Sequence, residues 1–372
     1  MTLASFRGGS RRKLTDHLRA GGGIMRFRRF VYLVMNDTKR LDFPLRRIDT
    51  SRLFFPKGVS NESMVPPPLE DVRLPPPAIR FSPPSTDCSN GAMEFMLLGG
   101  NGRKRAKVVA IDHTGRCVMY DPILRTIRTM PELTAAKFMP ASLAVGDDLY
   151  IIDTYFNLCS RDDCFDGLVY DEEEADWDCG TLPPPPYAHA FNPRSEIGPS
   201  HITSYAVVGG GRSGDGSSIW VSKKGLGTHS FDIAGSRWTK AGDWVLPFWG
   251  PGKYIPEHKL WFGILADKED GVVCASDLTE APLTAPRMVW RWRDNHVPLD
   301  WKCTLSFFVH LGHSRFCLAR FFRINRSDGL SCIKFVVLTG IEVERCDGEK
   351  LHVRKHRCQR YSLENQLMHW VL

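Results

Sequence analysis

Alternating apolar and polar positions in residues 108–153 predict a series of short strands separated by turns. The turns contain Gly115, Gly146 and Asp147, and the segments between them are rich in β-branched residues. Such runs, interrupted by Gly and Asp, are what antiparallel hairpins require. The strands expected in this region are residues 108–111, 116–120, 142–145 and 149–152.

An aromatic residue followed by Asp recurs along the chain. In each copy a large apolar residue follows six positions after the Asp: Tyr120-Asp121 with Ile127, Tyr170-Asp171 with Trp177, and Phe231-Asp232 with Trp238. A fainter copy is Ser276-Asp277 with Leu283. Successive Asp positions are 50, 61 and 45 residues apart, close to the roughly 40–50 residues of propeller blades with loop insertions. We expect the three aromatic residues to occupy equivalent strand positions, with the three apolar residues beginning the next strand.

The recurrence predicts an all-β protein, a single β-propeller of four-stranded antiparallel blades. A lone four-stranded sheet leaves two apolar faces exposed, so copies must stack around an axis to bury them. Six blades is the central expectation, within a range of about five to seven, because roughly 345 residues are available at about 50–60 per blade. A β-sandwich with coincidental repeats is the alternative. The apolar end of the chain, residues 369–372, is expected to pair beside the earliest strands and close the ring.

Double glycines follow two apolar strands, at Gly99-Gly100 and at Gly209-Gly210. A double Gly, a later aromatic residue and then a Trp resemble the kelch repeat, and residues 207–238 carry all three. The longer run of residues 95–153 is similar to a large uncharacterised family of grass-type plant proteins with kelch-like propellers. That resemblance covers residues 26–372, and it implies a fold but no activity. The leucine-rich helical hairpin of an F-box does not precede the propeller.

The basic charge of the chain is concentrated near its beginning. Residues 1–60 hold 14 Lys and Arg against 4 Asp, a net charge of +10, and the remainder of the chain therefore carries −3. We expect residues 1–24 to be a basic, disordered extension that is dispensable for folding, and residues 25–372 to form the propeller. A basic leader on a near-neutral body does not by itself indicate nucleic-acid binding. The alternative is a transit peptide to the plastid or mitochondrion, since such peptides are basic and poor in acids.

The cysteines indicate a reducing compartment, and the hydropathy indicates that the chain does not span a membrane. Eleven cysteines are scattered without paired short spacings, which is typical of reduced thiols in the cytosol or nucleus. No uninterrupted run of 18 apolar residues is present, so a membrane span is not expected. We expect a monomer whose partner is another protein, and neither a membrane nor a nucleic acid.

Several motifs that could carry chemistry lack the context that the chemistry needs. Gly209, Gly211 and Gly214 satisfy G-x-G-x-x-G, but residues 217–221 then read as a strand, whereas the dinucleotide fingerprint requires a helix. His352, His356 and Cys358 have the residue types of a zinc site but not its spacing. The nucleophile elbow, the H-E-x-x-H helix and the phosphate loop are all missing from the sequence. The sequence therefore predicts no cofactor, no metal and no catalytic residues.

Two stretches are candidates for partner binding. Residues 243–254 gather Trp244, Phe248, Trp249 and Tyr254 among Gly and Pro, as in a loop, and aromatic residues there would anchor a partner or pack between blades. Residues 162–178 hold nine acids and no Lys or Arg, without the spacing of a calcium loop, and we interpret them as a solvated insertion. Its most acidic part is Glu172, Glu173 and Glu174.

From these features we expect a non-catalytic scaffold that holds another protein with loops on one propeller face. The alternative is a metal- or carbohydrate-dependent enzyme, similar to a kelch-type oxidase, with a site on the propeller axis.

Overall fold

Antiparallel strands make up almost all the regular structure of the protein. The computed structural model describes residues 27–56, 69–85, 92–99, 106–154, 162–188, 201–209, 216–266, 271–281, 284–325, 332–346, 350–363 and 366–372. Within these residues there are 25 strands, one short 3₁₀ helix, η1 (Thr50–Leu53), and no α-helix. The predicted all-β class is therefore confirmed. The expected basic extension, residues 1–24, lies outside the described residues. Nothing in the described part of the chain is a helix long and apolar enough to span a bilayer.

Three sheets have four strands each and are antiparallel throughout. The first contains β25 (Gln366–Val371), β1 (Phe30–Asp37), β2 (Phe43–Asp49) and β4 (Ile79–Phe81). The second contains β5 (Met93–Leu98), β6 (Lys107–Asp112), β7 (Cys117–Asp121) and β8 (Thr126–Met130). The third contains β9 (Ala141–Val145), β10 (Asp148–Ile152), β11 (Phe165–Asp171) and β12 (Asp176–Thr181).

Two larger sheets complete the structure. An eight-stranded sheet consists of two antiparallel runs, namely β13 (Ser204–Gly209), β14 (Ser217–Lys223), β15 (Gly227–Asp232) and β16 (Arg237–Gly242), and then β17 (Phe248–Ile255), β18 (Leu260–Leu265), β19 (Val273–Asp277) and β20 (Arg287–Trp292). The two runs are joined by a parallel pair, β13 with β17. A five-stranded sheet contains β21 (Lys302–Gly312), β22 (Arg315–Asn325), β23 (Cys332–Arg345), β24 (Leu351–Ser362) and β3 (Leu69–Asp71).

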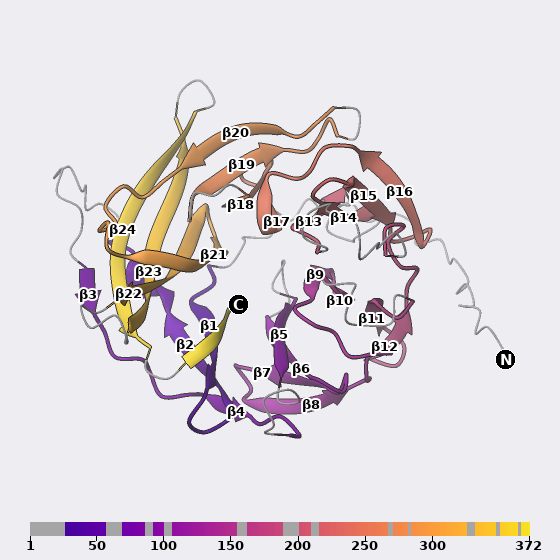
Figure 1. Ribbon diagram of the computed structural model, residues 1–372, viewed down its shortest axis with the longest axis horizontal. Coiled ribbons are helices and arrows are strands. Elements are labelled where there is room, and N and C mark those ends of the chain that lie inside the picture. The colour runs from indigo at the N-terminus through magenta and orange to yellow at the C-terminus, as the bar shows by residue number, and fades with distance from the viewer. Residues whose placement is uncertain are drawn as a thin grey trace.

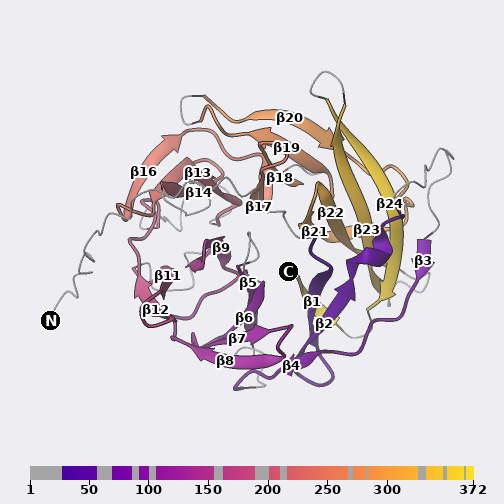
Figure 2. The same cartoon turned by 180° about the vertical axis from the view of Figure 1, so that it is seen from behind.

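The sheets follow one another around the middle of the molecule, as Figures 1 and 2 show from opposite sides. Strands β5, β9 and β17 lie toward the middle, and β8, β12, β16 and β20 lie at the outside. The last strand, β25, pairs antiparallel with β1, with Val371 opposite Leu33. The predicted pairing of the end of the chain with its earliest strand is therefore confirmed.

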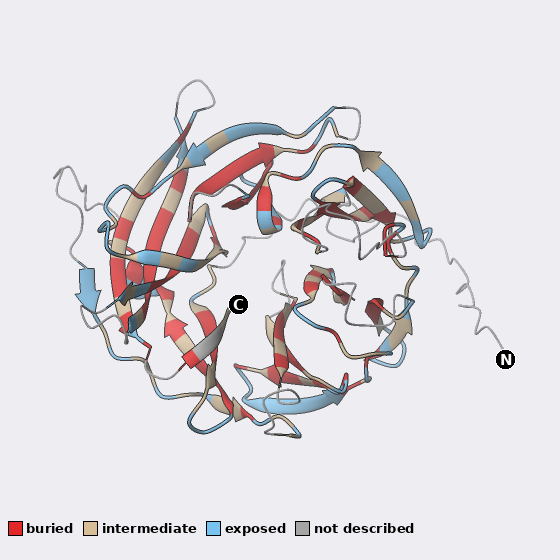
Figure 3. Ribbon diagram, in the orientation of Figure 1, coloured by how far each residue is buried: buried red, intermediate tan, exposed pale blue. Residues whose placement is uncertain are grey.

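Apolar side chains fill the space between neighbouring sheets. Successive residues of a strand point to opposite faces of its sheet, and in β6 both faces are buried: Val108 and Ala110 pack toward the β1 sheet, and Val109 and Ile111 toward the β9 sheet. Equivalent clusters of described residues join the β9 sheet to β14 and β15, β13 and β14 to β17–β19, β17–β19 to β22 and β23, and β22 and β23 back to β1. The outer strands β8, β16 and β20 are largely exposed (Figure 3).

The repeated aromatic-Asp pattern marks the same hairpin in three runs of strands. Tyr120, Tyr170 and Phe231 are each the second-last residue of the third strand in their run: β7, β11 and β15. Each lies directly opposite the apolar residue that the spacing predicted, in the pairs Tyr120 with Ile127, Tyr170 with Trp177, and Phe231 with Trp238. The predicted equivalence is confirmed. In the fainter copy Asp277 does end β19, but it lies opposite Arg287, and Leu283 is outside the described residues.

In two of the three pairs the Asp helps to fix the length of the turn. The Oδ1 atom of Asp171 accepts hydrogen bonds from the backbone N–H groups of Glu173 and Glu174, at 2.7 and 3.1 Å, and Asp121 makes the same two contacts in its turn. The fourth loop residue then has a positive φ: 58° at Arg125, 54° at Ala175 and 47° at Ser236. Asp side chains commonly stabilise such turns by bonding the backbone two residues on, so a constant loop keeps a constant spacing.

Two expectations about loops are wrong. Residues 162–178 are not an insertion, because they form most of the β11–β12 hairpin of a regular sheet. Residues 243–254 are not one loop, because only residues 243–247 lie between strands and β17 begins at Phe248. Gly250 and Pro251 suggested a loop, but they lie at a register shift in the pairing of β17 with β18, and a bulge is one of the places where a strand tolerates Pro.

Candidate functional site

Two of the four aromatic residues proposed for partner binding are core residues. Phe248 is 0% exposed and belongs to the cluster between β13–β14 and β17–β19. Trp244 is partly buried against the same cluster, and its ring centroid lies 5.6 Å from that of Trp220. For these two residues the structure agrees with the alternative that the sequence left open, packing between sheets.

The other two aromatic residues are exposed, but at opposite ends of β17. Trp249 is 53% exposed and Tyr254 is 41% exposed. Trp249 is near the start of the strand, and Tyr254 is next to the turn into β18. We call the side of the molecule where β13 and β17 begin the amino face, and the opposite side the carboxyl face. Trp249 therefore lies on the amino face, where its ring contacts that of His201 at 6.0 Å.

The three glutamates lie on the carboxyl face. Glu172, Glu173 and Glu174 are exposed in the turn between β11 and β12. The neighbouring Tyr170 donates its backbone N–H to Asp148 at the start of β10. Because β9 and β10 are antiparallel, the start of β10 lies at the end of the sheet opposite to the start of β9. The start of β9 is on the amino face, because Thr154, beside it, accepts a hydrogen bond from Ile202, just ahead of β13. The residues predicted for partner binding therefore do not form one site.

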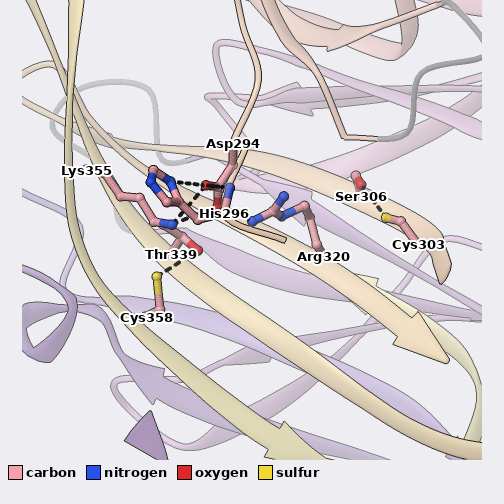
Figure 4. A network of polar contacts seen from close by, with 8 residues as sticks. All are labelled: Asp294, His296, Cys303, Ser306, Arg320, Thr339, Lys355 and Cys358. Atoms are coloured by element: carbon pink, nitrogen blue, oxygen red, sulfur yellow. Dashed lines mark hydrogen bonds and ion pairs between the residues drawn. The ribbon is translucent and has the colours of Figure 1, made fainter. Parts of the chain in front are cut away.

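A buried network of ion pairs lies below the amino face, where the segment 293–301 connects β20 to β21 (Figure 4). Asp294 is at its centre. Its Oδ2 atom accepts a hydrogen bond from Arg320 Nη2 at 2.5 Å, and both carboxylate oxygens accept from Lys355 Nζ at 2.9 Å. The exposed ring of His296 lies 3.4 Å from Oδ1. One carboxylate is thus shared by two buried or nearly buried cations.

The sheet explains why these three residues meet. Arg320 is in β22 and Lys355 is in β24, on either side of β23. Phe316 and Leu318, which precede Arg320 in β22, pack against the β17–β19 run. Phe322, which follows it, belongs to a separate cluster. Arg320 thus sits between two apolar clusters, where an unpaired charge would be costly, and the connecting segment supplies the carboxylate.

An open pocket of about 580 Å³ adjoins the network. Its described lining includes four cationic side chains and one acidic side chain, together with apolar and aromatic groups: Arg293, Lys302, Arg320, Arg323, Asp294, Val297, Leu299, Trp301 and Phe322. We call it the cationic pocket. Trp301 forms a rigid wall, because its ring packs against Phe335 at 4.6 Å and Phe322 at 5.2 Å. Leu299, at the rim, is fully exposed.

Among the residues that the structure describes, the acidic side chains do not balance the positive charge at the cationic pocket. Burial alone would raise the pKa of Asp294, but Arg320 and Lys355 outweigh it and hold that pKa below its ordinary value. Asp294 is therefore ionised at neutral pH and neutralises one of its two partners. The network keeps a net positive charge, and Lys302 and Arg323 add to it at the mouth of the pocket.

A second buried ion pair shows what a purely structural arrangement looks like. Lys137 and Asp166 are both fully buried, with Nζ 2.7 Å from Oδ2. Lys137 also donates to the carbonyls of Ala135 and Asp163, and Asp166 accepts from the hydroxyl and the N–H of Thr134. The charges cancel and the lysine makes three contacts. No charge is left over for a ligand.

Two of the residues with zinc-binding side chains, His356 and Cys358, make hydrogen bonds within the protein. His356 Nε2 lies 3.0 Å from Glu342 Oε2, and its Nδ1 accepts the N–H of Phe55 at 3.3 Å. Cys358 contacts the hydroxyl of Thr339 at 3.5 Å. Across the part of the chain that the structure describes, no three His, Cys, Asp or Glu side chains are grouped so that they could hold a metal ion.

No pattern in the sequence pointed to the cationic pocket as a whole. One signal was available, because Arg320 is a single charge inside the apolar run of β22. A buried Arg predicts an acidic partner, but the partner, Asp294, is 26 residues away in a connecting segment. Only the folded sheets show that Arg323, Lys302 and Lys355 belong to the same place.

These features define an all-β protein built of antiparallel sheets, with a rigid cationic pocket on the amino face. The chain belongs to the family described as "Protein of unknown function (DUF1668)", whose model matches residues 28–361. No curated protein matches the chain.

Proposed function

We propose that the antiparallel runs are the six blades of one closed, kelch-like propeller. Three observations support this. The last strand pairs with the first, so that β25 and β1 share a sheet. Clusters of buried residues join each run to the next and the β21–β24 sheet back to β1. The hairpin after Tyr120 recurs after Tyr170 and Phe231 in the same register. Radial stacking of this kind gives a rigid support for binding loops.

On this support the protein acts as a non-catalytic scaffold that binds another protein through its amino face. The observation that carries the proposal is the segment 293–301. It is anchored at one end by the ion pairs of Asp294 and at the other by the partly buried ring of Trp301, and between these anchors it holds Leu299 fully exposed. Trp and Arg are enriched at the energetic centres of protein interfaces, and a partner that covered them would also remove the exposed Leu299 side chain from water.

The rigidity of the segment 293–301 also supports the proposal. Ordering a loop on binding costs free energy, and a loop that is already fixed avoids that cost. Val297 packs with Trp301 in the cluster around Phe322 and Phe335, so the segment is held from its inner side as well. The exposed Trp249, also on the amino face, gives a second aromatic contact for the same partner.

The proposal is tested by capturing partners from the native tissue with the full-length protein and with Leu299→Asp. A matched control is Leu124→Asp, because Leu124 is 66% exposed in the β7–β8 turn, which is equivalent to the turn that carries Glu172 on the carboxyl face. Quantitative mass spectrometry should show a stoichiometric partner with the wild type and the control, and at least about a tenfold loss with Leu299→Asp, which corresponds to 1.4 kcal/mol.

The same samples distinguish the scaffold from an enzyme. Metal analysis and an assay with sugar alcohols are run alongside the mass spectrometry. Stoichiometric copper with turnover would contradict the scaffold and favour an oxidase with a site on the axis. Equal capture by wild type and Leu299→Asp would move the interface away from the amino face.

A further inference from the structure

Lys302 and Arg323 lie directly opposite each other on β21 and β22, and both line the cationic pocket. Like charges in directly opposed positions of a sheet repel and destabilise the pair. The structure gives neither side chain an acidic partner among the described residues. A sheet keeps such a pair at a cost, and an anion between the two side chains would remove that cost.

Arg320 lines the same pocket from the other face of β22 and adds a third cation with unused capacity. It is 5% exposed, and only its Nη2 group donates a hydrogen bond to Asp294. Its Nε group is buried without a hydrogen-bond partner. Buried polar groups are nearly always bonded, and a guanidinium has a planar fork of donors that suits a carboxylate or a phosphate. Since Lys355 also holds Asp294, that carboxylate cannot neutralise Arg320 completely.

We infer that the cationic pocket binds a phosphorylated side chain of the partner protein. This inference rests on the proposed scaffold function and names the group that the scaffold recognises. A phosphate monoester carries close to two negative charges and three strong acceptor oxygens at neutral pH. It therefore matches Arg320, Lys302 and Arg323 better than a single carboxylate, which already occupies the inner side of the network as Asp294.

The surroundings favour a peptide over a nucleic acid. The pocket is one focus of positive charge with an apolar rim, formed by Leu299 and Val297, whereas nucleic acids are bound by extended basic tracks. Beyond residue 60 the chain carries a net charge of −3, so the pocket is a local exception on a near-neutral body. The phosphoryl group would dock against the cations, and Leu299 and Trp301 would contact the residues that flank it.

The experiment uses the full chain and a degenerate peptide library with one fixed central residue. The central residue is phosphoserine, phosphothreonine or phosphotyrosine in three pools, and unmodified serine or glutamate in two control pools. The best binders are then measured by isothermal titration calorimetry, with inorganic phosphate and a single-stranded RNA oligonucleotide as competing ligands. We expect one phosphorylated pool to bind at least about tenfold more tightly than its serine and glutamate counterparts.

A pair of charge-swap variants locates the binding. In Lys302→Glu/Arg323→Glu two of the three exposed cations of the pocket, the pair on β21 and β22, are reversed. In the control Arg237→Glu/Lys259→Glu the same change is made at two exposed cations outside the pocket, on β16 and in the β17–β18 turn. We expect at least about a hundredfold loss of phosphopeptide affinity in the first and less than about twofold in the second, because two charge-assisted contacts are lost only in the first.

Several outcomes would overturn the inference. These are equal binding of the serine and phosphorylated pools, preference for the RNA, binding of inorganic phosphate without any gain from the peptide, or no binding in any pool. If the phosphorylated pools fail while Leu299→Asp still abolishes partner capture, the scaffold stands and its recognition of phosphate does not.

Discussion

Trp370 donates a hydrogen bond from its indole Nε1 to Glu94 Oε2 at 3.2 Å, and so connects the last strand, β25, to β5 of the neighbouring sheet. The second carboxylate oxygen of Glu94 accepts the N–H of Met139, just ahead of β9, at 3.1 Å. One carboxylate thus links three segments near the middle of the molecule. Burial raises the pKa of Glu94 from 4.5 to about 7, although both hydrogen bonds act in the opposite direction.

The raised pKa predicts that stability depends on pH through Glu94. An acid whose pKa is higher in the folded protein stabilises the fold fully below its unfolded pKa, and the contribution is lost as pH rises through the folded pKa. We therefore expect the free energy of unfolding to fall by at most about 3.5 kcal/mol between pH 4.5 and pH 7 and then to level off, since one pKa unit corresponds to about 1.4 kcal/mol.

The Glu94→Gln variant isolates this effect, because its amide does not titrate in this range, although its single oxygen can accept only one of the two hydrogen bonds. The lost contact lowers stability by a constant amount, so urea unfolding at several pH values should give a difference between the two proteins that changes between pH 4.5 and neutrality. A constant difference across the range would show that Glu94 is not the group responsible.

The buried position of Asp294 predicts a large cost when its charge is removed. In Asp294→Asn the cations Arg320 and Lys355 lose their counter-ion while they stay buried or nearly so. Breaking a buried pair in this way typically costs about 3–5 kcal/mol. The matched control is Asp176→Asn, which removes an exposed pair with Arg128 whose side chains are 47% and 45% exposed, and this should cost less than about 1 kcal/mol. Similar losses in the two variants, measured by urea unfolding, would mean that the network contributes little.

The recurring hairpin predicts a stabilising substitution. Ala175 is an exposed turn residue with a φ of 54°, a conformation that glycine adopts without strain. Ala175→Gly should therefore raise the free energy of unfolding by about 0.5–1 kcal/mol. Glu174→Gly, one position earlier in the same turn, serves as the control, because this residue has no positive φ. It should be neutral or destabilising, and a gain at both positions would contradict the explanation from backbone conformation.

The architecture was readable from the sequence where local chemistry fixes geometry. Asp171 and Asp121 bond their own turns, so the distance from Tyr170 to Trp177 is repeated from Tyr120 to Ile127 and visible as spacing. The same kind of reasoning was wrong for β17. Its Gly250 and Pro251 are typical of loops, and the strand exists because β13 pairs alongside it, which no local pattern records.

The cationic pocket was hidden for a different reason. Lys355 is 61 residues from Asp294, and the two belong to different elements. Charges at such separations carry no periodic signal, and only the packing of the connecting segment over the sheet brings them together. The sequence instead drew attention to large aromatic residues such as Phe248, and this residue packs between sheets, where large side chains are needed to fill the space.

The proposed closure of the ring predicts that Trp370 stabilises the whole molecule. Its ring lies 5.1 Å from that of Phe95 in β5 and 6.0 Å from that of Phe43 in β2, so it packs between two sheets. We expect Trp370→Ala to lower the free energy of unfolding by about 2–4 kcal/mol, less than for a fully buried ring because Trp370 is only partly buried. Trp249→Ala, which removes an exposed ring, should cost less than about 1 kcal/mol.

Circular dichroism during urea unfolding, together with hydrogen exchange, would distinguish a closing strand from a peripheral one. If β25 closes a ring, Trp370→Ala should keep a single transition at lower urea, with faster exchange of amides in every sheet, because each sheet depends on its neighbours for a buried face. If only the amides of β25 and β1 exchange faster and the main transition does not move, the strand is an attachment to one sheet, and the ring is not closed through it.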